Sequence, residues 1–240
     1  MTSTDKDSPR WRAVLLWWVG LAAMVVVWDL ASASYPVYAF PGPRATWEAL
    51  LGLIRDEELA GSVLLTLQRA LTGLGIACLI GLPWGWAAGT WKPVAELTES
   101  WAQLLMAIPP IVVVVVGVLW LGPTAGVVLL VVALVTLPLL VTTLRDAVAN
   151  VDPDLLEMAR LFQFGLWGTV RWVIVPAVVP PVLSAVTIAL GQSIRLTVMA
   201  ELLSTATGMG AEVQQARTNL ETADVFALSA VMAALTLGLE

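Results

Sequence analysis

Residues 152–176 read Asp-Pro-Asp-Leu-Leu-Glu-Met-Ala-Arg-Leu-Phe-Gln-Phe-Gly-Leu-Trp-Gly-Thr-Val-Arg-Trp-Val-Ile-Val-Pro and form a charged island in a very apolar chain. Three basic and four acidic residues gather in and just before it: Arg145, Arg160, Arg171, Asp146, Asp152, Asp154 and Glu157. Long uncharged segments lie on both sides. The island is therefore expected to emerge into water between two membrane spans and to offer a docking site to a soluble partner.

The composition predicts an all-α integral membrane protein. Hydrophobic residues make up 59% of the 240 residues and charged residues 12%, whereas soluble domains carry about 25% charged residues. The mean hydropathy is +0.87. At about 20 residues per spanning helix the chain has room for five or six spans. We expect residues 1–12 to be a cytoplasmic N-terminus and residues 13–240 to form a single membrane domain.

Residue usage excludes several function classes. The sequence contains no histidine, which argues against haem, most transition-metal sites and histidine-based catalytic triads, so no metal site and no catalytic residue is predicted. Cys78 is the single cysteine and lies in an apolar run, where a buried thiol is the expected state. The net charge of −6 without a basic tail gives no indication of nucleic-acid binding.

Six apolar runs predict the spans, at about 13–33, 64–90, 101–121, 124–144, 172–199 and 223–240. The first resembles a signal peptide, but no small-residue cleavage site follows it, so we expect a retained helix. An external loop over 33–60 should carry one short amphipathic helix. The last run, from Val225, rises only about 24 Å. We expect that its helix either begins earlier, in the preceding loop, or is cut short.

Small residues and prolines mark two spans. The second span contains five glycines, most of them about one helical turn apart: Gly73, Gly75, Gly81, Gly85 and Gly89. Such residues let helix backbones approach closely in lipid, and packing is the interpretation we favour. In the third span, Pro109-Pro110 must break the hydrogen bonding. A break of this kind is tolerated against protein or a wet cavity, so both a packing kink and a pathway lining remain open.

Basic residues predict the orientation. If the N-terminus is inside, seven lie on the inner side (Lys6, Arg10, Arg12, Lys92, Arg145, Arg160, Arg171) and three on the outer side (Arg44, Arg55, Arg217). The positive-inside rule then favours a cytoplasmic N-terminus. The charged island is cytoplasmic in this arrangement. Asp152-Pro153 is a typical helix start, and physics alone predicts a short surface helix, with a solvated loop as the alternative.

Further motifs resemble those of a known family. Glu157-Met158-Ala159-Arg160 followed by Val173-Ile174-Val175-Pro176 resembles the EAA loop of ABC importer permeases. Segments similar to the nitrate/sulfonate/taurine-type permeases occur along the chain: Phe40-Pro41-Gly42-Pro43, Thr66-Leu67-Gln68-Arg69, Ala107-Ile108-Pro109-Pro110, Val151-Asp152-Pro153-Asp154-Leu155-Leu156 and Ala200-Glu201. The likeness covers residues 36 to 238.

The resemblance implies a type I importer permease of a bacterial or archaeal cytoplasmic membrane. Its implied partners are a second copy, two cytoplasmic ABC ATPases and an external solute-binding protein. A coupling helix at about 153–168 would dock on the ATPase, through Asp154, Glu157, Ala159, Arg160, Gln163 and Gly165. Gln163 stands where the family usually has Gly, and we expect Gly165 to supply the turn instead. The chain has no Gly-x-x-x-x-Gly-Lys-Ser/Thr loop, so ATP and Mg²⁺ would bind to the partner ATPase.

Arg195 and Glu201 are the charged pathway candidates. A cation within a span is by default a functional candidate, and the family's familiar solutes are small anions, so Arg195 could form a positive site on an anion pathway. A snorkelling or subunit-interface arginine is the alternative. Six residues on a helix turn through about 600°, or about 120° short of two full turns, which places Glu201 on a different face and makes it no obvious partner of Arg195. Arg69 is interpreted as a snorkelling or end-of-helix group.

A self-sufficient channel or secondary carrier is the rival function. Such proteins usually carry mid-span carboxylates or an inverted repeat, and neither is found here. The solute stays open among sulfonate, nitrate, bicarbonate and a thiamine-precursor pyrimidine.

Overall fold

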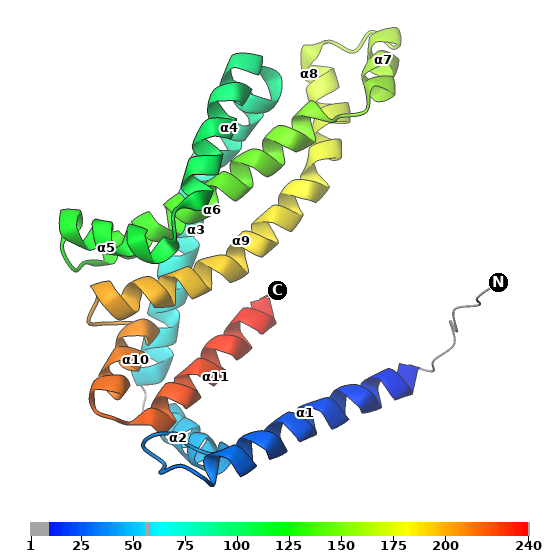
Figure 1. Ribbon diagram of the computed structural model, residues 1–240. Coiled ribbons are helices and arrows are strands. Elements are labelled where there is room, and N and C mark those ends of the chain that lie inside the picture. Colours follow the sequence, from blue (N-terminus) through cyan, green and yellow to red (C-terminus); the bar gives the residue numbers. More distant parts are fainter. Residues whose placement is uncertain (1–9, 56–57, 240) are drawn as a thin grey trace. The chain divides into compact units, whose positions relative to one another are not determined.

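The computed structural model describes residues 10–55 and 58–239, and all regular structure within them is helical (Figure 1). The elements in chain order are α1 (Arg10–Ser32), α2 (Pro43–Arg55), α3 (Glu58–Thr90), α4 (Lys92–Ala107), α5 (Pro110–Leu121), α6 (Ala125–Ala149), α7 (Pro153–Leu161), α8 (Leu166–Thr169), the π-helix η1 (Val170–Ile174), α9 (Val175–Ser204), α10 (Met209–Thr218) and α11 (Thr222–Leu239). The chain divides into two compact units, Met1–Glu57 with Gln215–Ala230 and Glu58–Gln214 with Val231–Glu240.

An aromatic cluster holds the smaller unit together. The Trp28 indole stacks on Phe226 with ring centroids 5.9 Å apart, and Phe40 meets Phe226 edge-on at 5.7 Å. Trp28 Nε1 also donates to the Pro41 carbonyl at 3.0 Å. A Cβ on Gly42 would lie 2.7 Å from Ser32 Oγ. The Phe40–Pro43 motif is thus a short non-helical connection that ties the end of α1 to the start of α11, and the predicted short helix, α2, begins at its last residue.

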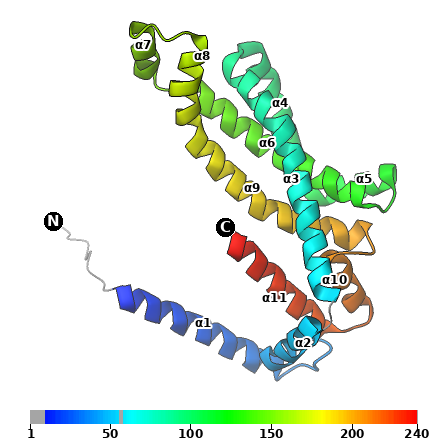
Figure 2. The same cartoon turned by 180° about the vertical axis from the view of Figure 1, so that it is seen from behind.

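The larger unit is built on three long helices. α3, α6 and α9 pack along one another, as the view from behind shows (Figure 2). Their buried contacts are apolar. One cluster joins α5, α6 and α9 through residues such as Val114, Val131 and Leu196, and a second joins α3, α6 and α9 through Leu74, Leu140 and Ala189.

Glycine contacts bring α3 and α6 close together. A Cβ at Gly85 would lie 2.8 Å from the Val141 carbonyl oxygen, and one at Gly89 would lie 2.6 Å from Val148 Cβ. Gly73 and Gly81 similarly approach Val132 and Leu137. The predicted packing role is therefore confirmed for four of the five glycines. A Cβ at Gly75 would meet no other atom within 4 Å, because this glycine lies on another face of α3.

Three described helices are long and apolar enough to cross a membrane: Leu59–Thr90, Ala125–Ala149 and the continuous stretch Leu166–Ser204. The third predicted span, 101–121, is not one straight helix. α4 and α5 meet at an angle of 91°, and Figure 1 shows α5 turning sharply away from α4. If this bent pair counts as one span, the described residues hold four.

The predicted break at Pro109-Pro110 is confirmed. Neither proline has an N–H to donate, so α4 ends at Ala107 and α5 starts at Pro110. The two remaining predicted spans coincide with shorter apolar helices, Trp18–Ser32 and Thr222–Gly238. α11 begins at Thr222, three residues before the apolar run. The total of six spans stays a prediction.

The α3–α6 contact leads to a test of packing. Gly85→Ala places a methyl group against the Val141 backbone, which cannot move aside like a flexible side chain, and should lower the free energy of unfolding by about 1–3 kcal/mol. Gly75→Ala is the matched control, because open space surrounds that position. Thermal unfolding in detergent measures both. Equal melting temperatures for the two variants would contradict the packing role of Gly85.

Candidate functional site

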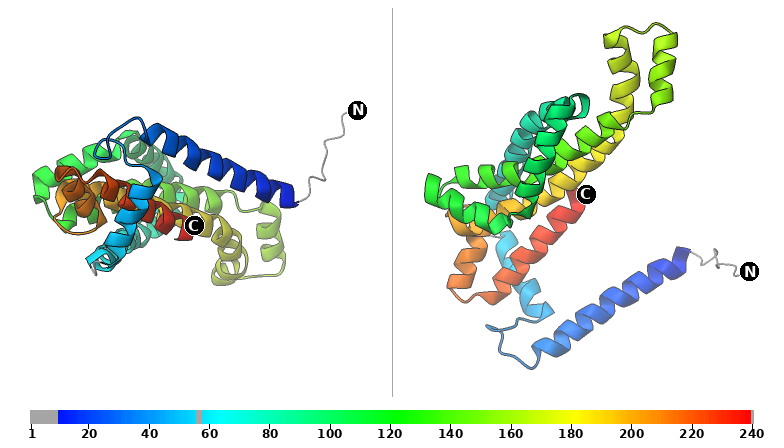
Figure 3. Two further views of the ribbon diagram at one scale, coloured as in Figure 1. Left: turned by 90° about the horizontal axis from the view of Figure 1, so that it is seen from below. Right: turned by 45° about the horizontal axis from the view of Figure 1, so that its top comes forward.

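The charged island folds as a hairpin of two short helices, α7 and α8, which we call the α7–α8 hairpin (Pro153–Thr169). It lies at one end of α9, and the right-hand view of Figure 3 shows its two arms. The Asp152 carboxylate accepts a hydrogen bond from the Asp154 N–H at 2.9 Å, and Pro153 occupies the first helical turn. This is the predicted helix start, and it is confirmed.

The predicted single helix over 153–168 is interrupted at Gln163. This residue has a positive φ of 56°, the left-handed region. The Phe164 N–H donates to the Ala159 carbonyl and the Gln163 N–H to the Arg160 carbonyl, at 2.9 and 3.0 Å. Together these bonds form a Schellman motif, which ends α7.

Gln163 therefore makes the turn at the position where the family resemblance leads us to expect glycine. The expectation that Gly165 supplies the turn is wrong, because Gly165 adopts an ordinary extended conformation with φ −63° and ψ 168°. The helix end is not shifted along the chain. Its backbone hydrogen bonds offset the strain of a side chain in the left-handed region, which costs about 1–2 kcal/mol.

The six coupling candidates divide by burial. Asp154, Glu157, Arg160, Gln163 and Gly165 are exposed, whereas Ala159 is fully buried. Ala159 packs in a cluster with Leu144, Val151, Val173 and Val178. It thus fastens α7 to α6 and to the start of α9 and does not itself present a docking surface. The described ion pairs do not include Glu157 with Arg160.

The outer surface of the hairpin is apolar as well as charged, which the sequence patterns did not predict. Large apolar side chains at its tip are strongly exposed: Leu161, Phe162, Leu166 and Trp167, with Leu166 at 91%. Arg171 lies over the Trp172 ring, with 5.5 Å between the guanidinium carbon and the ring centroid. Clustered exposed apolar groups are typical of a surface that a partner or membrane covers.

A π-helical turn, η1, joins the hairpin to α9. The Val175 N–H donates to the Val170 carbonyl, five residues back. The turn lies directly before Pro176, where the regular bonding pattern must be interrupted because proline has no N–H. The helix then continues without a gap, so residues 166–204 form one helical rod from the hairpin to Ser204.

The other end of this rod carries a buried carboxylate. Glu201 is fully buried and accepts hydrogen bonds from Arg69 Nη1 at 2.6 Å, Thr66 Oγ1 at 2.8 Å and the Gly210 N–H at 3.2 Å. Arg69 also donates to the carbonyl and the hydroxyl of Thr207, at 2.8 and 2.9 Å. We refer to Thr66, Arg69, Glu201 and residues 207–210 as the Glu201 cluster.

The Glu201 cluster changes two interpretations made from the sequence. Arg69 does not snorkel but forms an ion pair with Glu201. Glu201 is fully buried and does not line the hollow that lies beside Arg195; its place on the pathway stays a prediction. Two charged residues of opposite sign, at the outer ends of the second and fifth predicted spans, were the signal that could have indicated the pair.

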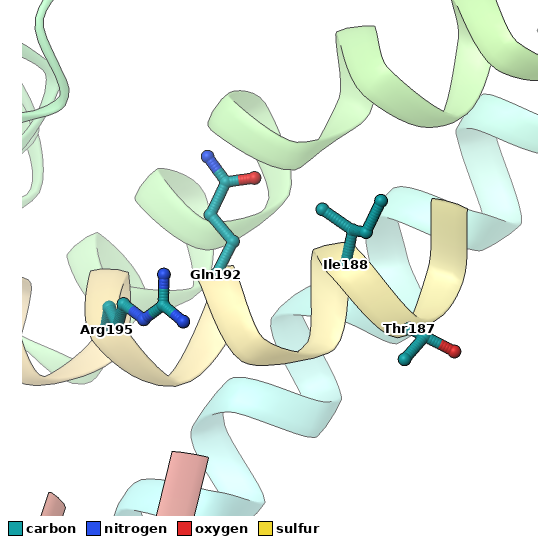
Figure 4. A pocket seen from close by; sticks show the side chains of 4 residues that line it. All are labelled: Thr187, Ile188, Gln192 and Arg195. Atoms are coloured by element: carbon teal, nitrogen blue, oxygen red, sulfur yellow. The ribbon is translucent and has the colours of Figure 1, made fainter. Parts of the chain in front are cut away.

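Arg195 lies on a different face of α9 from Glu201, about 120° around the helix, because the six residues between them turn through about 600°. It is exposed, and with Thr187, Ile188 and Gln192 it lines an open hollow of about 510 Å³. Figure 4 shows these four side chains along successive turns of α9. A polar, charged face on a helix of this hydropathy needs water or protein beside it. The hollow is thus a candidate for part of a polar pathway.

Comparison with known proteins agrees with this architecture. The family model described as binding-protein-dependent transport system inner membrane component matches residues 81–239. A probable ABC transporter permease of Brucella melitensis is 30% identical over 83% of this chain and 80% of its own length. A putative aliphatic sulfonates transport permease of Bacillus subtilis is 29% identical over 88% of this chain and 78% of its own length.

Two further similarities concern a third permease and the fold. The taurine transport system permease of Escherichia coli is 28% identical over 96% of this chain and 88% of its own length. A crystal structure of an amino acid ABC transporter superposes with a TM-score of 0.67 and 16% identity, over 79% of this chain and 93% of that chain. With the family match over residues 81–239, these findings show that the chain belongs to the binding-protein-dependent inner membrane components, the permeases of ABC importers.

Proposed function

We propose that this permease works as a homodimer that receives solute from an external binding protein and is driven by two copies of a separate cytoplasmic ATPase. The observation that carries the proposal is the α7–α8 hairpin, whose tip exposes Leu161, Phe162, Leu166 and Trp167. The chain has no phosphate-binding loop of its own. ATP and Mg²⁺ therefore bind to the partner, and the hairpin takes up the partner's movement.

The hairpin is suited to transmit force. Its apolar tip would fill a groove on the ATPase, while exposed Asp154, Glu157 and Arg160 would meet polar groups at the rim. At the base of the hairpin, buried Ala159 and Val173 pack it onto the spanning helices. A push on the tip would then move α9 as well as the hairpin. The seven-to-three distribution of basic residues supports a cytoplasmic hairpin and N-terminus.

The polar face of α9 would line the pathway in the dimer. Arg195 supplies positive charge, and Gln192 and Thr187 supply hydrogen-bonding groups in the same hollow. An anionic solute fits these groups, and sulfonate and taurine are the solutes named for two related permeases. The break at Pro109-Pro110 is a second candidate for the lining, since non-helical backbone at membrane depth needs protein or water beside it.

Purification of the tagged subunit from its native membrane tests the overall proposal. An ATPase should co-purify with the subunit, and the complex should hydrolyse ATP faster when the loaded binding protein is added. Proteoliposomes with the subunit alone should move no solute. Solute flux without ATPase or ATP would instead identify a self-sufficient channel or carrier.

Substitution at the hairpin tip tests the docking surface. Leu166→Glu puts a charge on a side chain that is 91% exposed, so it should leave the melting temperature unchanged and weaken ATPase binding about tenfold or more. Ala159→Glu should also uncouple transport, but with loss of stability, because it buries a charge. Binding of the ATPase to immobilised permease measures the effect. Undiminished binding to Leu166→Glu would contradict the docking role.

Measurements of solute uptake test the role of Arg195 in the pathway. A panel of alkyl sulfonates, nitrate and bicarbonate first identifies the solute of the wild-type complex. Arg195→Ala should then lower its uptake roughly tenfold, since a hydrogen bond to a charged group contributes about 1.5–3 kcal/mol. Arg217→Ala, an exposed arginine outside the hollow, serves as control. Wild-type uptake by Arg195→Ala would remove this residue from the pathway.

A further inference from the structure

The Glu201 cluster joins four parts of the larger unit: α3, the end of α9, the loop after it and the start of α10. Ser62, Thr66 and Arg69 follow one face of α3, at intervals of four and three residues. Ser62 Oγ donates to the Glu212 carboxylate, and Thr66 and Arg69 donate to Glu201 on α9. The loop and the start of α10 are bound by the same groups, since the Met209 N–H donates to Thr66 Oγ1 at 2.9 Å.

The position of Glu201 has an electrostatic reason. The residue lies in the last turn of α9, where the helix dipole disfavours a negative charge. The Arg69 guanidinium compensates this charge from α3. The Gly210 N–H belongs to the first turn of α10, the end of a helix that favours an anion. The carboxylate therefore binds the end of one helix to the beginning of the next.

Glycines let the loop fit closely around the carboxylate. A Cβ on Gly208 would lie 2.4 Å from Glu201 Oε1, and one on Gly210 would lie 2.3 Å from the Val198 carbonyl oxygen. Gly208 also has a φ of 99°, which other residues rarely adopt. The loop thus packs directly against Glu201 at the end of α9, so a displacement of this helix end would press on the loop and on the start of α10.

The same helical rod carries the hairpin and the Glu201 cluster at its two ends. Residues 166–204 form 39 residues of continuous helix, about 58 Å at 1.5 Å per residue. Figures 1 and 2 show α7 and α8 at one end of α9 and the start of α10 at the other. With the hairpin in the cytoplasm, the Glu201 cluster lies toward the external face.

We propose that Arg69 and Glu201 are positioning residues for transport, which pass the movement of the α7–α8 hairpin through α9 to the external loop 205–208 and to the start of α10. The inference rests on the proposed function, because it needs an ATPase at the hairpin. In return, a binding protein that presses on the external side would act on the ATPase through the same contacts.

The test separates this role from a purely structural one. Arg69→Met alone leaves a buried carboxylate without its cation and should therefore lower the melting temperature markedly. The double variant Arg69→Met/Glu201→Gln removes both charges and keeps a side-chain acceptor for the Gly210 N–H, so it should melt close to wild type. It nevertheless loses the bonds from Arg69 to Thr207.

The assembled complex is measured for ATP hydrolysis with and without the loaded binding protein. In the double variant we expect hydrolysis to persist while its stimulation by the binding protein falls at least fivefold. Arg44→Met/Glu48→Gln, which removes an exposed ion pair of α2, is the matched control and should keep full stimulation. Full stimulation in the Arg69/Glu201 double variant would overturn the inference.

A fluorophore on the loop gives a second readout. It is attached to Ala206→Cys, an exposed position, in a Cys78→Ala background. ATP should change its emission in the wild-type complex and not in the double variant, whereas an equal change in both would count against the inference.

If the double variant does not fold, Thr66→Val replaces it, because this nearly isosteric change breaks two bonds of the cluster without altering charge. A wild-type complex that binding protein does not stimulate would contradict the proposed function instead.

Discussion

The close approach of α3 and α6 is the contact on which the larger unit depends. Lipid tails are as apolar as leucine, so helices in a membrane associate through packing and hydrogen bonds and not through a hydrophobic driving force. Glycines at positions 73, 81, 85 and 89 remove the side chains that would separate the two backbones. α9 then packs against both helices, which determines where its two ends, the hairpin and Glu201, are held.

Apolar packing holds the middle of α9, and hydrogen bonds to Glu201 hold its end. Its middle section contacts α3 and α6 through small residues such as Ala185 and Ala189, and these contacts are apolar and not directional. At Glu201 the bonding is directional, and a shift of the helix end relative to the loop would have to break hydrogen bonds to a buried carboxylate. The π-turn before Pro176 is the one irregular section of the described rod, and it lies next to the hairpin.

Sequence patterns predicted the features that depend on local chemistry. Asp152-Pro153 as a helix start, the break at Pro109-Pro110 and the packing glycines follow from capping, from a missing N–H and from residue size, and the structure agrees with each. Arg69 with Glu201 was not predicted, because the two residues are 132 positions apart and meet only after three helices have packed. The exposed hairpin tip was missed since hydrophobicity alone does not distinguish a buried Ala159 from an exposed Leu166.

The left-handed turn at Gln163 has a consequence for partner choice. Backbone hydrogen bonds from Gln163 and Phe164 hold the turn, so the residue at this position does not need to be glycine to keep the hairpin's direction. A glycine would present only backbone to an interacting protein, whereas this permease presents an exposed amide that can both donate and accept hydrogen bonds. If the hairpin docks on the ATPase as proposed, its corner would be a place where this permease could distinguish its own ATPase from others.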